Sequence, residues 1–567
     1  MKAKHKIANN FALFADDVKQ VEGIRVLLIY PPVRLNQEPL YPPFGLLSIA
    51  SVLERAGAKV EIMDLNMLRL PFEALKREIA KREFDVVATG GMTTVYYYMK
   101  FLAAYFRKDY PDVPLIAGGT ACSGSPEVVM ENTKFDVAVL GEGEPVIIDI
   151  IFKLLNNKVL SDVPGIFFRE RNGKIVKTEG RPRMQNLEEL PLPAYHLIDM
   201  EQYISNSDIY KNKKNKVAEA RISKLNLDRT KAARPMMIFS KRGCPFGCNF
   251  CYRNFGRKVV GLSVQNTLDH MSFLEKNYNT INFVFGDEIF NVDKKWVIEF
   301  CNAVIAEKRN YILNVGNGLR ANVVDKEIMG KMMEAGFCSV AVGIESFYDP
   351  TLKDMEKGQT AEEVANAIRI IKDTGFHLVS AQFLFGYPSD CKESMEANVK
   401  MCKELGLKNA GFAIPCPYPG TYLFDKALEE GYLVDVEGWL MELADRDISD
   451  RIINMSNLTD AELTKLIAEG QDEIRMYFIG KGYPIAGWFM ARLQKMGRKV
   501  GINAFDILKA IKDAMKILIV EGKWAKSWRK SGGTNDTYIR DEIFELLEEW
   551  DSEAKSGKTE AINSIAA

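Results

Sequence analysis

The sequence is short of several features that would place the protein in a familiar class. It has 567 residues and a net charge of only −1, so charge gives no reason to expect binding to nucleic acid or to a membrane surface. No stretch approaches about twenty uninterrupted apolar residues, and we therefore expect no membrane span. The N-terminal segment is basic and then polar, and its one apolar patch is too short for a secretion signal.

Cysteine is present without a secretory context. Nine cysteines in a long chain with no secretion signal argue for a reducing, cytoplasmic location and against disulfides. The hydrophobic fraction of 47% is enough to form large cores. At about 100–200 residues per domain, the length corresponds to roughly three to five domains.

Short apolar strand candidates alternate with helix candidates from Ile24 to about Asn156. The first strand, IRVLLIY, is followed by the amphipathic segment FGLLSIASVLERAG at residues 44–57. The later strand candidates are KVEIMDL, DVVATGG, PLIAGGT and DVAVLGEGE. This alternation predicts an α/β domain with a Rossmann-like, doubly wound parallel sheet.

The carboxyl ends of these strands are the predicted ligand-binding rim, because ligands of such sheets bind outside those ends. Glycine recurs there, which allows a bulky ligand to approach the backbone, although a single glycine could simply turn the chain. Several glycines at one rim favour a large ligand. The rim residues are Tyr30, Pro31, Pro32, Gly90, Gly91, Met92, Gly118, Gly119, Thr120, Gly141, Glu142 and Gly143.

The common ligand signatures are missing from this rim. A dinucleotide-binding site requires GxGxxG after the first strand, where this chain has YPPV. A phosphoacceptor domain requires an aspartate at the end of the third strand, where this chain has Thr89-Gly90-Gly91. The runs YPPFGLLSIASVLERAG, GGTACSGSPEVV and DVAVLGEGEP resemble the cobalamin-binding domain that precedes some radical SAM domains. The resemblance implies that the rim residues contact cobalamin. None of the four histidines lies in a DxHxxG context, so we expect no histidine ligand to cobalt.

A linker candidate follows the first domain. VPGIFFRERNGKIVK predicts a hairpin with Asn-Gly at its turn. From Lys211 to Arg234, nine cations stand against two anions. We favour a solvated loop for this basic run; the alternative is a lid or a docking surface for an acidic substrate or partner.

The stretch SKRGCPFGCNFCYRNFG places Cys244, Cys248 and Cys251 within eight residues. Pro245 and Gly247 favour a loop there. A structural zinc site and a ferredoxin cluster both take four protein ligands, and no fourth ligand stands nearby. A cluster held here would leave one iron open.

CxxxCxxC with an aromatic residue, Phe250, before the last cysteine resembles the radical SAM signature. The resemblance implies a 4Fe–4S cluster whose open iron binds the amino and carboxylate groups of S-adenosylmethionine (SAM). It also implies that reduction of the cluster cleaves SAM and releases a 5′-deoxyadenosyl radical.

Six strand–helix units follow, which predicts a partial (β/α)6 barrel with its chemistry at the carboxyl ends of the strands. The strand candidates are PMMIFSK, TINFVFGDE, ILNVGNGL, CSVAVGIES, HLVSAQFLFGYP and AGFAIPCPYPG.

The same resemblance assigns SAM contacts to these strand ends. Gly286, Asp287 and Glu288 match the segment that holds the methionine amino group, and Arg320 is expected to pair with the methionine carboxylate. Glu345, in GIES, matches a residue that contacts the ribose or the amino group. The alternative for each is a solvated strand end or a helix cap. The expected SAM contacts are Phe250, Gly286, Asp287, Glu288, Arg320, Glu345 and Gln382.

The tail after Leu433 is helical in pattern, and we expect a helical cap whose tryptophans form a core or a wall of the substrate pocket. The expected segments are an N-terminal extension (1–22), the cobalamin-binding domain (23–156), a linker with a basic insertion (157–234), the radical SAM partial barrel (235–430) and a helical C-terminal domain (431–567).

Taken together, the chain resembles a cobalamin-dependent radical SAM enzyme. The resemblance implies a methyltransferase that acts on an unactivated carbon, with the 5′-deoxyadenosyl radical activating the substrate and methylcobalamin carrying the methyl group. The alternative within this family is a radical cyclase or rearrangement enzyme that forms a ring without methyl transfer. A different class, a cobalamin or redox sensor, is disfavoured by the cysteine triad. A methylthiotransferase is disfavoured because the first domain has only Cys122 for a second cluster.

The sequence leaves the substrate and the catalytic acids and bases unidentified. We expect a small-molecule, lipid or peptide substrate and a low-potential electron donor such as ferredoxin or flavodoxin.

Overall fold

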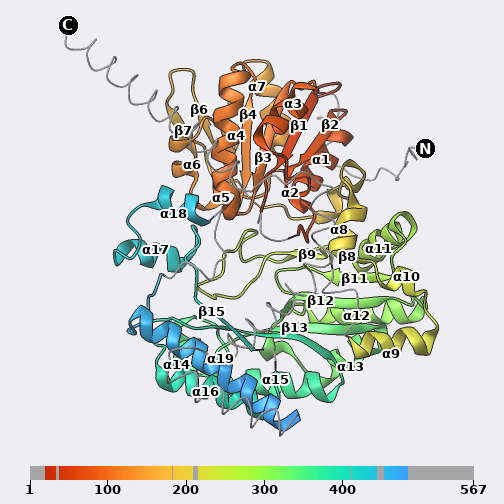
Figure 1. The fold of residues 1–567 in the computed structure, drawn as a ribbon. Coiled ribbons are helices and arrows are strands. Elements are labelled where there is room, and N and C mark those ends of the chain that lie inside the picture. Colours follow the sequence, from red (N-terminus) through yellow and green to blue (C-terminus); the bar gives the residue numbers. More distant parts are fainter. Residues whose placement is uncertain are drawn as a thin grey trace, which may run out of the picture.

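Two parallel sheets, one above the other in Figure 1, form the frame of the computed structural model. The structure describes residues 20–33, 38–181, 183–207, 215–408, 410–443 and 453–482. Nearly all of the expected N-terminal extension and most of the expected C-terminal domain therefore lie outside the described residues, as do Lys211, Lys213 and Lys214 of the basic run.

The first sheet has the order β2-β1-β3-β4-β5-β6-β7. Its first five strands are parallel and match the five predicted strands. The hairpin that we expected in the linker is present as β6 and β7, and it extends this sheet because β6 pairs antiparallel with β5. The strands are β1 (Arg25–Tyr30), β2 (Lys59–Asp64), β3 (Val86–Gly91), β4 (Leu115–Gly119), β5 (Val137–Val139), β6 (Ile166–Arg169) and β7 (Ile175–Lys177).

Helices cover both faces of this sheet because apolar side chains leave each strand alternately to either side. In β1, Val26 and Leu28 join the core under α1 and α7, whereas Leu27 and Ile29 join the core under α3, α4 and α6. The doubly wound prediction is thus confirmed. The helices of this domain are α1 (Phe44–Arg55), α2 (Leu65–Leu68), α3 (Phe72–Ala80), α4 (Tyr96–Asp109), α5 (Thr120–Gly124), α6 (Pro126–Asn132) and α7 (Ile147–Leu155).

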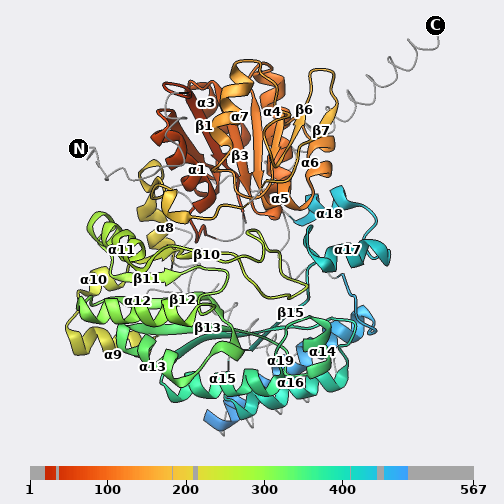
Figure 2. The same ribbon diagram turned by 180° about the vertical axis from the view of Figure 1, so that it is seen from behind.

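The second sheet has the order β15-β14-β13-β12-β11-β8, with every pair of neighbouring strands parallel. It is the predicted partial barrel. Helices α13, α15 and α16 cover its side turned away from the first domain (Figures 1 and 2). The strands are β8 (Pro235–Ile238), β11 (Asn282–Phe285), β12 (Ile312–Leu319), β13 (Phe337–Glu345), β14 (His377–Leu384) and β15 (Ala410–Ala413). The helices are α11 (Val264–Tyr278), α12 (Lys294–Ala306), α13 (Lys326–Ala335), α14 (Asp349–Asp354), α15 (Ala361–Asp373), α16 (Lys392–Glu404) and α17 (Tyr422–Glu429).

Between the two sheets, at mid-height in both views, lies a short antiparallel pair of strands, β9 (Lys241–Arg242) and β10 (Val260–Gly261). The segment that joins them contains the three clustered cysteines.

The described part of the basic run is helical rather than the solvated loop that we favoured. Two of its arginines anchor it to the barrel: Arg221 Nε donates to Tyr311 O at 2.9 Å, and Arg234 Nε donates to Tyr278 O at 3.0 Å. Partnered in this way, these arginines are not available for an acidic ligand. The linker helices are α8 (Met200–Asn206), α9 (Lys216–Leu225) and α10 (Arg229–Ala232).

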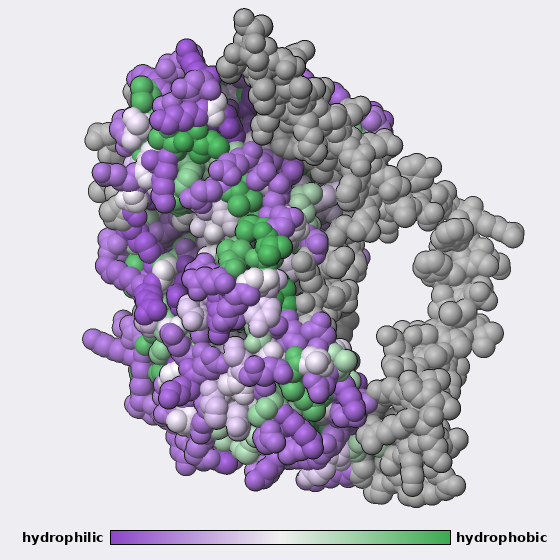
Figure 3. Space-filling model, turned by 90° about the vertical axis from the view of Figure 1, so that its left-hand side faces the viewer, coloured by the Kyte–Doolittle hydropathy of each residue, from purple (hydrophilic) through white to green (hydrophobic). Residues whose placement is uncertain are grey.

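At the C-terminal end, the structure describes α18 (Val436–Leu443) and α19 (Asp460–Gly482). None of the helices in the described ranges is long and apolar enough to cross a membrane. The surface in Figure 3 is mostly hydrophilic, with hydrophobic patches at mid-height. In and after α17, Tyr422, Tyr432 and Val434 are exposed apolar side chains.

Candidate active site

The cysteine segment is a closed loop, as the sequence predicts. Cys244 N donates to Gly256 O at 3.1 Å, which joins the two ends of the loop. Gly243, just before it, has φ +98°, and a Cβ atom there would collide with Lys258 O. Glycine is therefore needed to bring the chain from β9 into the loop.

The three thiols gather inside this loop. The neighbouring Cys251 side chain and the Lys357 and Arg320 cations lower the pKa of Cys248, against the opposing effect of burial. Burial raises the pKa of Cys244, which also interacts electrostatically with Cys248. In the described part of the chain, no three acidic, histidine or cysteine side chains are close enough to share one metal ion. A cubane does not require this, because each thiolate binds a different iron.

We expected Arg320 to pair with the methionine carboxylate of SAM. In the structure its guanidinium already has partners within the protein. Its Nη1 lies 3.4 Å from Cys248 Sγ, and its Nε donates to Asn322 Oδ1 at 3.2 Å. Its Nη2 donates to the carbonyl of Lys357, and the guanidinium stacks 4.0 Å from the centre of the Phe246 ring. The side chain is therefore held beside a cysteine sulfur.

Lys357 is a residue of this site that the sequence analysis missed. It is buried, and its Nζ lies 2.8 Å from Glu345 Oε1 and 5.6 Å from the centre of the Phe250 ring. Glu345 itself has φ +63°, a left-handed conformation that non-glycine residues rarely adopt. A lone lysine between two helices carries no sequence signal, so only the fold identifies it.

The acidic pair divides into two different environments. Asp287 is buried, and its carboxylate accepts hydrogen bonds from Ser240 N at 2.6 Å, Ser240 Oγ at 2.5 Å and Lys241 N at 3.1 Å. These bonds tie β11 to the segment between β8 and β9 and give Asp287 a structural role; its contact with a SAM amino group stays a prediction.

Glu288, the second carboxylate, faces the cysteine loop. Burial raises its pKa, and the nearby backbone N–H groups of Gly243 and Phe255 oppose that shift. Its Oε2 is buried and has no hydrogen-bond partner among the described atoms. A buried acceptor without a donor is costly, and it fits a ligand ammonium group. Gly286, before the pair, leaves room for Met237 and Phe239, which would lie 2.8 Å from an added Cβ.

The two remaining expected SAM contacts lie in the cysteine loop and in the barrel sheet. Phe250 packs edge-on against Tyr387, with the ring centres 6.4 Å apart. Gln382 is exposed on β14, in register with Gly343 of β13 and beside Gly411 of β15.

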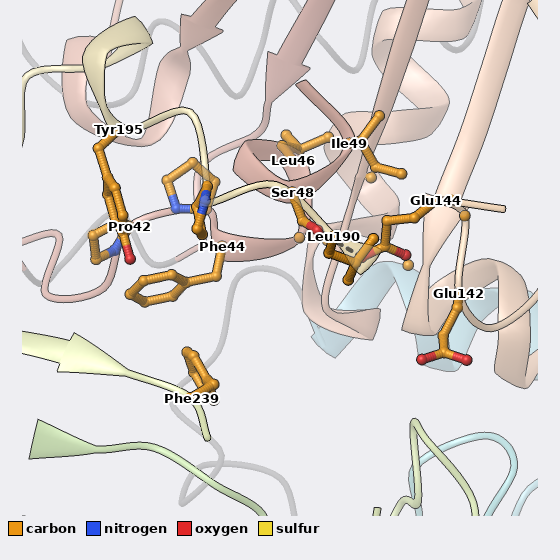
Figure 4. Close-up of a pocket in the computed structure, with 18 of the residues that line it drawn as sticks. Pro42, Phe44, Leu46, Ser48, Ile49, Glu142, Glu144, Leu190, Tyr195 and Phe239 are labelled. Atoms are coloured by element: carbon orange, nitrogen blue, oxygen red, sulfur yellow. Dashed lines mark hydrogen bonds between the residues drawn. The ribbon is translucent and has the colours of Figure 1, made fainter. Parts of the chain in front are cut away.

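A cavity of about 1650 Å³ lies between the two domains. It is larger than the roughly 300–1,000 Å³ of ordinary small-molecule pockets. The cavity extends along the sheet face under α1 as far as Leu28, Ala88, Ile116 and Val139. Figure 4 shows the part of the cavity around Phe44, Ser48 and Glu144. Of the predicted rim residues, these line it: Tyr30, Gly90, Gly91, Met92, Gly118, Gly119, Thr120, Gly141, Glu142 and Gly143.

Some of the rim prediction needs correction. Pro31 and Pro32 are buried beside the cavity rather than lining it. Gly90 lies against β4, because an added Cβ would be 2.7 Å from Gly118 O, and a Cβ on Gly119 would collide with Gly91 O. These two glycines allow the strands to approach each other. Gly118, by contrast, has nothing within 4 Å of an added Cβ and is open to the cavity.

The opposite wall of the cavity comes from the second domain. It contains Phe239, Lys241 and Arg242, just before the cysteines, and Asn254 and Phe255, just after them. A ligand on the glycine rim would therefore face the cysteine loop.

Comparison with known proteins agrees with this arrangement. Residues 32–151 match the family model of the B12 binding domain, and residues 238–408 match that of the Radical SAM superfamily. The chain is a radical SAM enzyme with a B12-binding domain. Its cofactors are accordingly a 4Fe–4S cluster, SAM and cobalamin.

Several curated radical SAM relatives cover most of the chain. An uncharacterized methyltransferase of Pyrococcus horikoshii is 26% identical over 451 residues, 78% of this chain and 91% of the relative. The anaerobic magnesium-protoporphyrin IX monomethyl ester cyclase of Rubrivivax gelatinosus is 24% identical, over 73% of this chain and 72% of the relative. The cytidylyl-2-hydroxyethylphosphonate methyltransferase of Streptomyces wedmorensis is 26% identical, over 77% and 87%.

Solved radical SAM structures share the fold. The cobalamin-dependent enzyme OxsB superposes with a TM-score of 0.58 at 15% identity, covering 94% of this chain and 84% of that one. The methyltransferase TsrM of Kitasatospora setae superposes with a TM-score of 0.56 at 18% identity, covering 71% and 76%.

Proposed function

We propose that this radical SAM enzyme transfers a methyl group to an unactivated carbon of its substrate. The observation that carries the proposal is the shared cavity: one wall is the glycine rim of the B12-binding domain, and the other is formed by residues that flank the cysteine loop. The three cysteines and the expected SAM contacts do not themselves line this cavity, but a substrate in it would lie between the glycine rim and the segments that flank the cysteine loop on both sides.

The bound cofactors supply the radical and the transferable methyl group, and the side chains of this protein hold and orient them. Cys244, Cys248 and Cys251 would bind three irons of the cluster. Glu288, with its unpartnered Oε2, would accept a hydrogen bond from the SAM ammonium group. The adenosyl portion of SAM would lie in the barrel near Phe250 and Gln382.

On the other wall, the open edge at Gly118 and the exposed side chain of Met92 would contact the corrin ring. The apolar recess at Leu28, Ala88, Ile116 and Val139 would take the part of cobalamin that extends below the ring. Its depth within the sheet suits a large and partly apolar ligand.

Two partners follow from this reaction. A reduced 4Fe–4S cluster needs a low-potential electron donor, for which ferredoxin or flavodoxin is the proposed type. The substrate class stays open among small molecules, lipids and peptides.

The relatives support methyl transfer and also suggest a second candidate. Methyltransferases of Pyrococcus horikoshii and Streptomyces wedmorensis favour the proposal, whereas the cyclase of Rubrivivax gelatinosus favours oxidative ring formation without methyl transfer. The two reactions differ in what becomes of the methyl group of SAM.

A labelling experiment separates these functions. The full chain, anaerobically reconstituted with iron, sulfide and cobalamin, is given methyl-deuterated SAM, a low-potential reductant and an extract of small metabolites and lipids. A product heavier by one labelled methyl group supports the proposal, and an oxidised product without label supports the cyclase. A chain that binds cobalamin but assembles no cluster and cleaves no SAM would point to a sensor. Cys248→Ala is the control, because it removes the cluster.

A further inference from the structure

A buried network of charges joins the two walls of the cavity. Arg242 Nη1 lies 3.1 Å from Glu142 Oε1, and Arg242 Nη2 lies 2.8 Å from Glu144 Oε1. The side chains of Glu142 and Glu144 are only 3% and 6% exposed. Ser48 Oγ also donates to Glu144 Oε1 at 2.7 Å, as the dashed line in Figure 4 shows, and Met184 N donates to Glu142 Oε2 at 2.9 Å. Both oxygens of Glu142 and one oxygen of Glu144 are thus engaged.

On the cobalamin side, the network begins in the rim. Glu142 and Glu144 follow β5, in the segment 141–144 that lines the cavity. Gly141 has φ +64°, and a Cβ on Gly143 would lie 3.0 Å from Ile49 of α1. The segment thus packs closely against α1, and a ligand on the rim would contact it directly.

On the cluster side, the network ends one residue before the cysteine loop. Arg242 is followed by Gly243 and Cys244, and its guanidinium lies 4.8 Å from the centre of the Phe255 ring. Gly243 and Phe255 also lie close enough to Glu288 for their backbone N–H groups to favour its charged form. The contacts thus run from the rim through Arg242 to Phe255 and to the backbone at the start of the cysteine loop, beside the carboxylate proposed to hold SAM.

From this continuity we infer that Arg242 is a positioning residue that couples the two cofactor sites, so that cobalamin binding tightens SAM binding and the reverse. A ligand that orders the rim segment holds Glu142 and Glu144 in place, and through them the backbone before Cys244. The second ligand then meets a site that is already ordered and loses less conformational entropy on binding. By linkage, the two effects on affinity must be equal. The inference rests on the proposed function, since it requires both cofactors to bind.

Equilibrium binding without turnover tests the coupling. SAM affinity is measured by dialysis of radiolabelled SAM against the cluster-loaded full chain, with and without hydroxocobalamin and in the absence of reductant. Cobalamin affinity is measured with and without SAM by the change in its visible spectrum. We expect each ligand to tighten the other by about fivefold or more, the lower end of ordinary allosteric coupling. Arg242→Lys should bring this factor close to one, because an ammonium group cannot bridge both carboxylates as the guanidinium fork does.

An ion pair at the opposite end of β5 supplies the matched control. Arg107 Nη2 lies 2.9 Å from Asp136 Oδ2, at the amino end of β5 and away from the cavity. Arg107→Lys should leave the coupling factor unchanged. Should Arg242→Lys fail to fold, the triple variant Glu142→Gln, Glu144→Gln, Arg242→Met removes the network and both of its buried carboxylates together. Arg183, which lies 3.6 Å from Glu142 Oε1, keeps its hydrogen bond to Lys258 O.

The outcomes separate this inference from the proposed function. If Arg242 only supports the fold, Arg242→Lys will weaken the binding of both cofactors and leave the coupling factor unchanged. That result would overturn the inference. Independent binding of the two cofactors in the unmodified chain would overturn it as well, while leaving the proposed function standing. Failure of cobalamin to bind at all would overturn both.

Discussion

The guanidinium of Arg320 lies 3.4 Å from the sulfur of Cys248, although 72 residues separate them in the chain. Asn322, the carbonyl of Lys357 and the ring of Phe246 hold the guanidinium in this position. The Arg320 guanidinium is therefore already positioned to donate a hydrogen bond to Cys248 when that thiolate binds the cluster.

This contact predicts an effect on cluster potential. Hydrogen bonds and positive charge near the sulfurs stabilise the reduced cluster, so Arg320→Met should lower the midpoint potential. A difference of about 1–2 kcal/mol between the oxidation states corresponds to a shift on the order of 50 mV for one electron. A redox titration followed by electron paramagnetic resonance measures it. Arg221→Met, which removes a half-buried arginine of the linker helix α9 that bonds to Tyr311 O, is the control. An unchanged potential in Arg320→Met would contradict the prediction.

The adjacent carboxylates Asp287 and Glu288 should respond differently to neutralisation. Glu288→Gln replaces the acceptor proposed for the SAM ammonium group, and loss of a charged hydrogen bond of about 1.5–3 kcal/mol should weaken SAM binding by about 10-fold to 100-fold. Asp287→Asn should instead lower the melting temperature, because Asp287 accepts three hydrogen bonds from Ser240 and Lys241. SAM dialysis and thermal unfolding of both variants measure the two effects. A larger loss of SAM affinity in Asp287→Asn than in Glu288→Gln would reverse the assignment.

The strands and the cysteine motif were predictable because their signals are local. Alternating or continuous apolar runs identify strands, and three cysteines within one short loop identify a cluster site without knowledge of the fold. The same is true of the glycine rim, whose position after each strand follows from the parallel topology.

The partners of the individual side chains were not predictable in the same way. Asp287 bonds to a serine 47 residues earlier, and Arg320 bonds to a cysteine 72 residues earlier. Asp287 and Glu288 lie beyond the end of β11 at Phe285, where the alternation of a strand no longer fixes the direction of each side chain. No local pattern therefore separates the environments of the two carboxylates. The ion network of Arg242 depends on how the two domains meet, which no local pattern encodes.

Protonation of His270 predicts a pH dependence of stability. Burial lowers the pKa of His270 from 6.5 to about 4, and its Nε2 lies 3.0 Å from the hydroxyl of Tyr195. Below pH 6.5 His270 becomes protonated in the unfolded chain, whereas in the folded chain it stays neutral until about pH 4. The free energy of unfolding should therefore fall as pH drops through this window, by about 3 kcal/mol from this group.

Thermal unfolding of the cofactor-free chain between pH 4 and 7 checks this expectation. His270→Gln keeps a hydrogen-bonding side chain beside Tyr195 but cannot take up the proton, so its melting temperature should fall less steeply with pH. His196→Gln, which alters an exposed histidine paired with Glu54, should keep the steep dependence. Parallel curves for His270→Gln and the unmodified chain would rule out this source of the dependence.

Gly118 and Gly119, neighbours on the rim, should separate cobalamin binding from folding. An added side chain at Gly118 meets nothing within 4 Å and projects into the cavity, so Gly118→Leu should preserve the fold and weaken cobalamin binding by tenfold or more. Gly119 has φ +85°, and its Cβ would collide with Gly91 O. Gly119→Ala should therefore destabilise the fold by about 1–3 kcal/mol or more. Spectral titration with hydroxocobalamin and thermal unfolding distinguish the two. If Gly118→Leu bound cobalamin as tightly as the unmodified chain, the corrin ring could not lie against this strand.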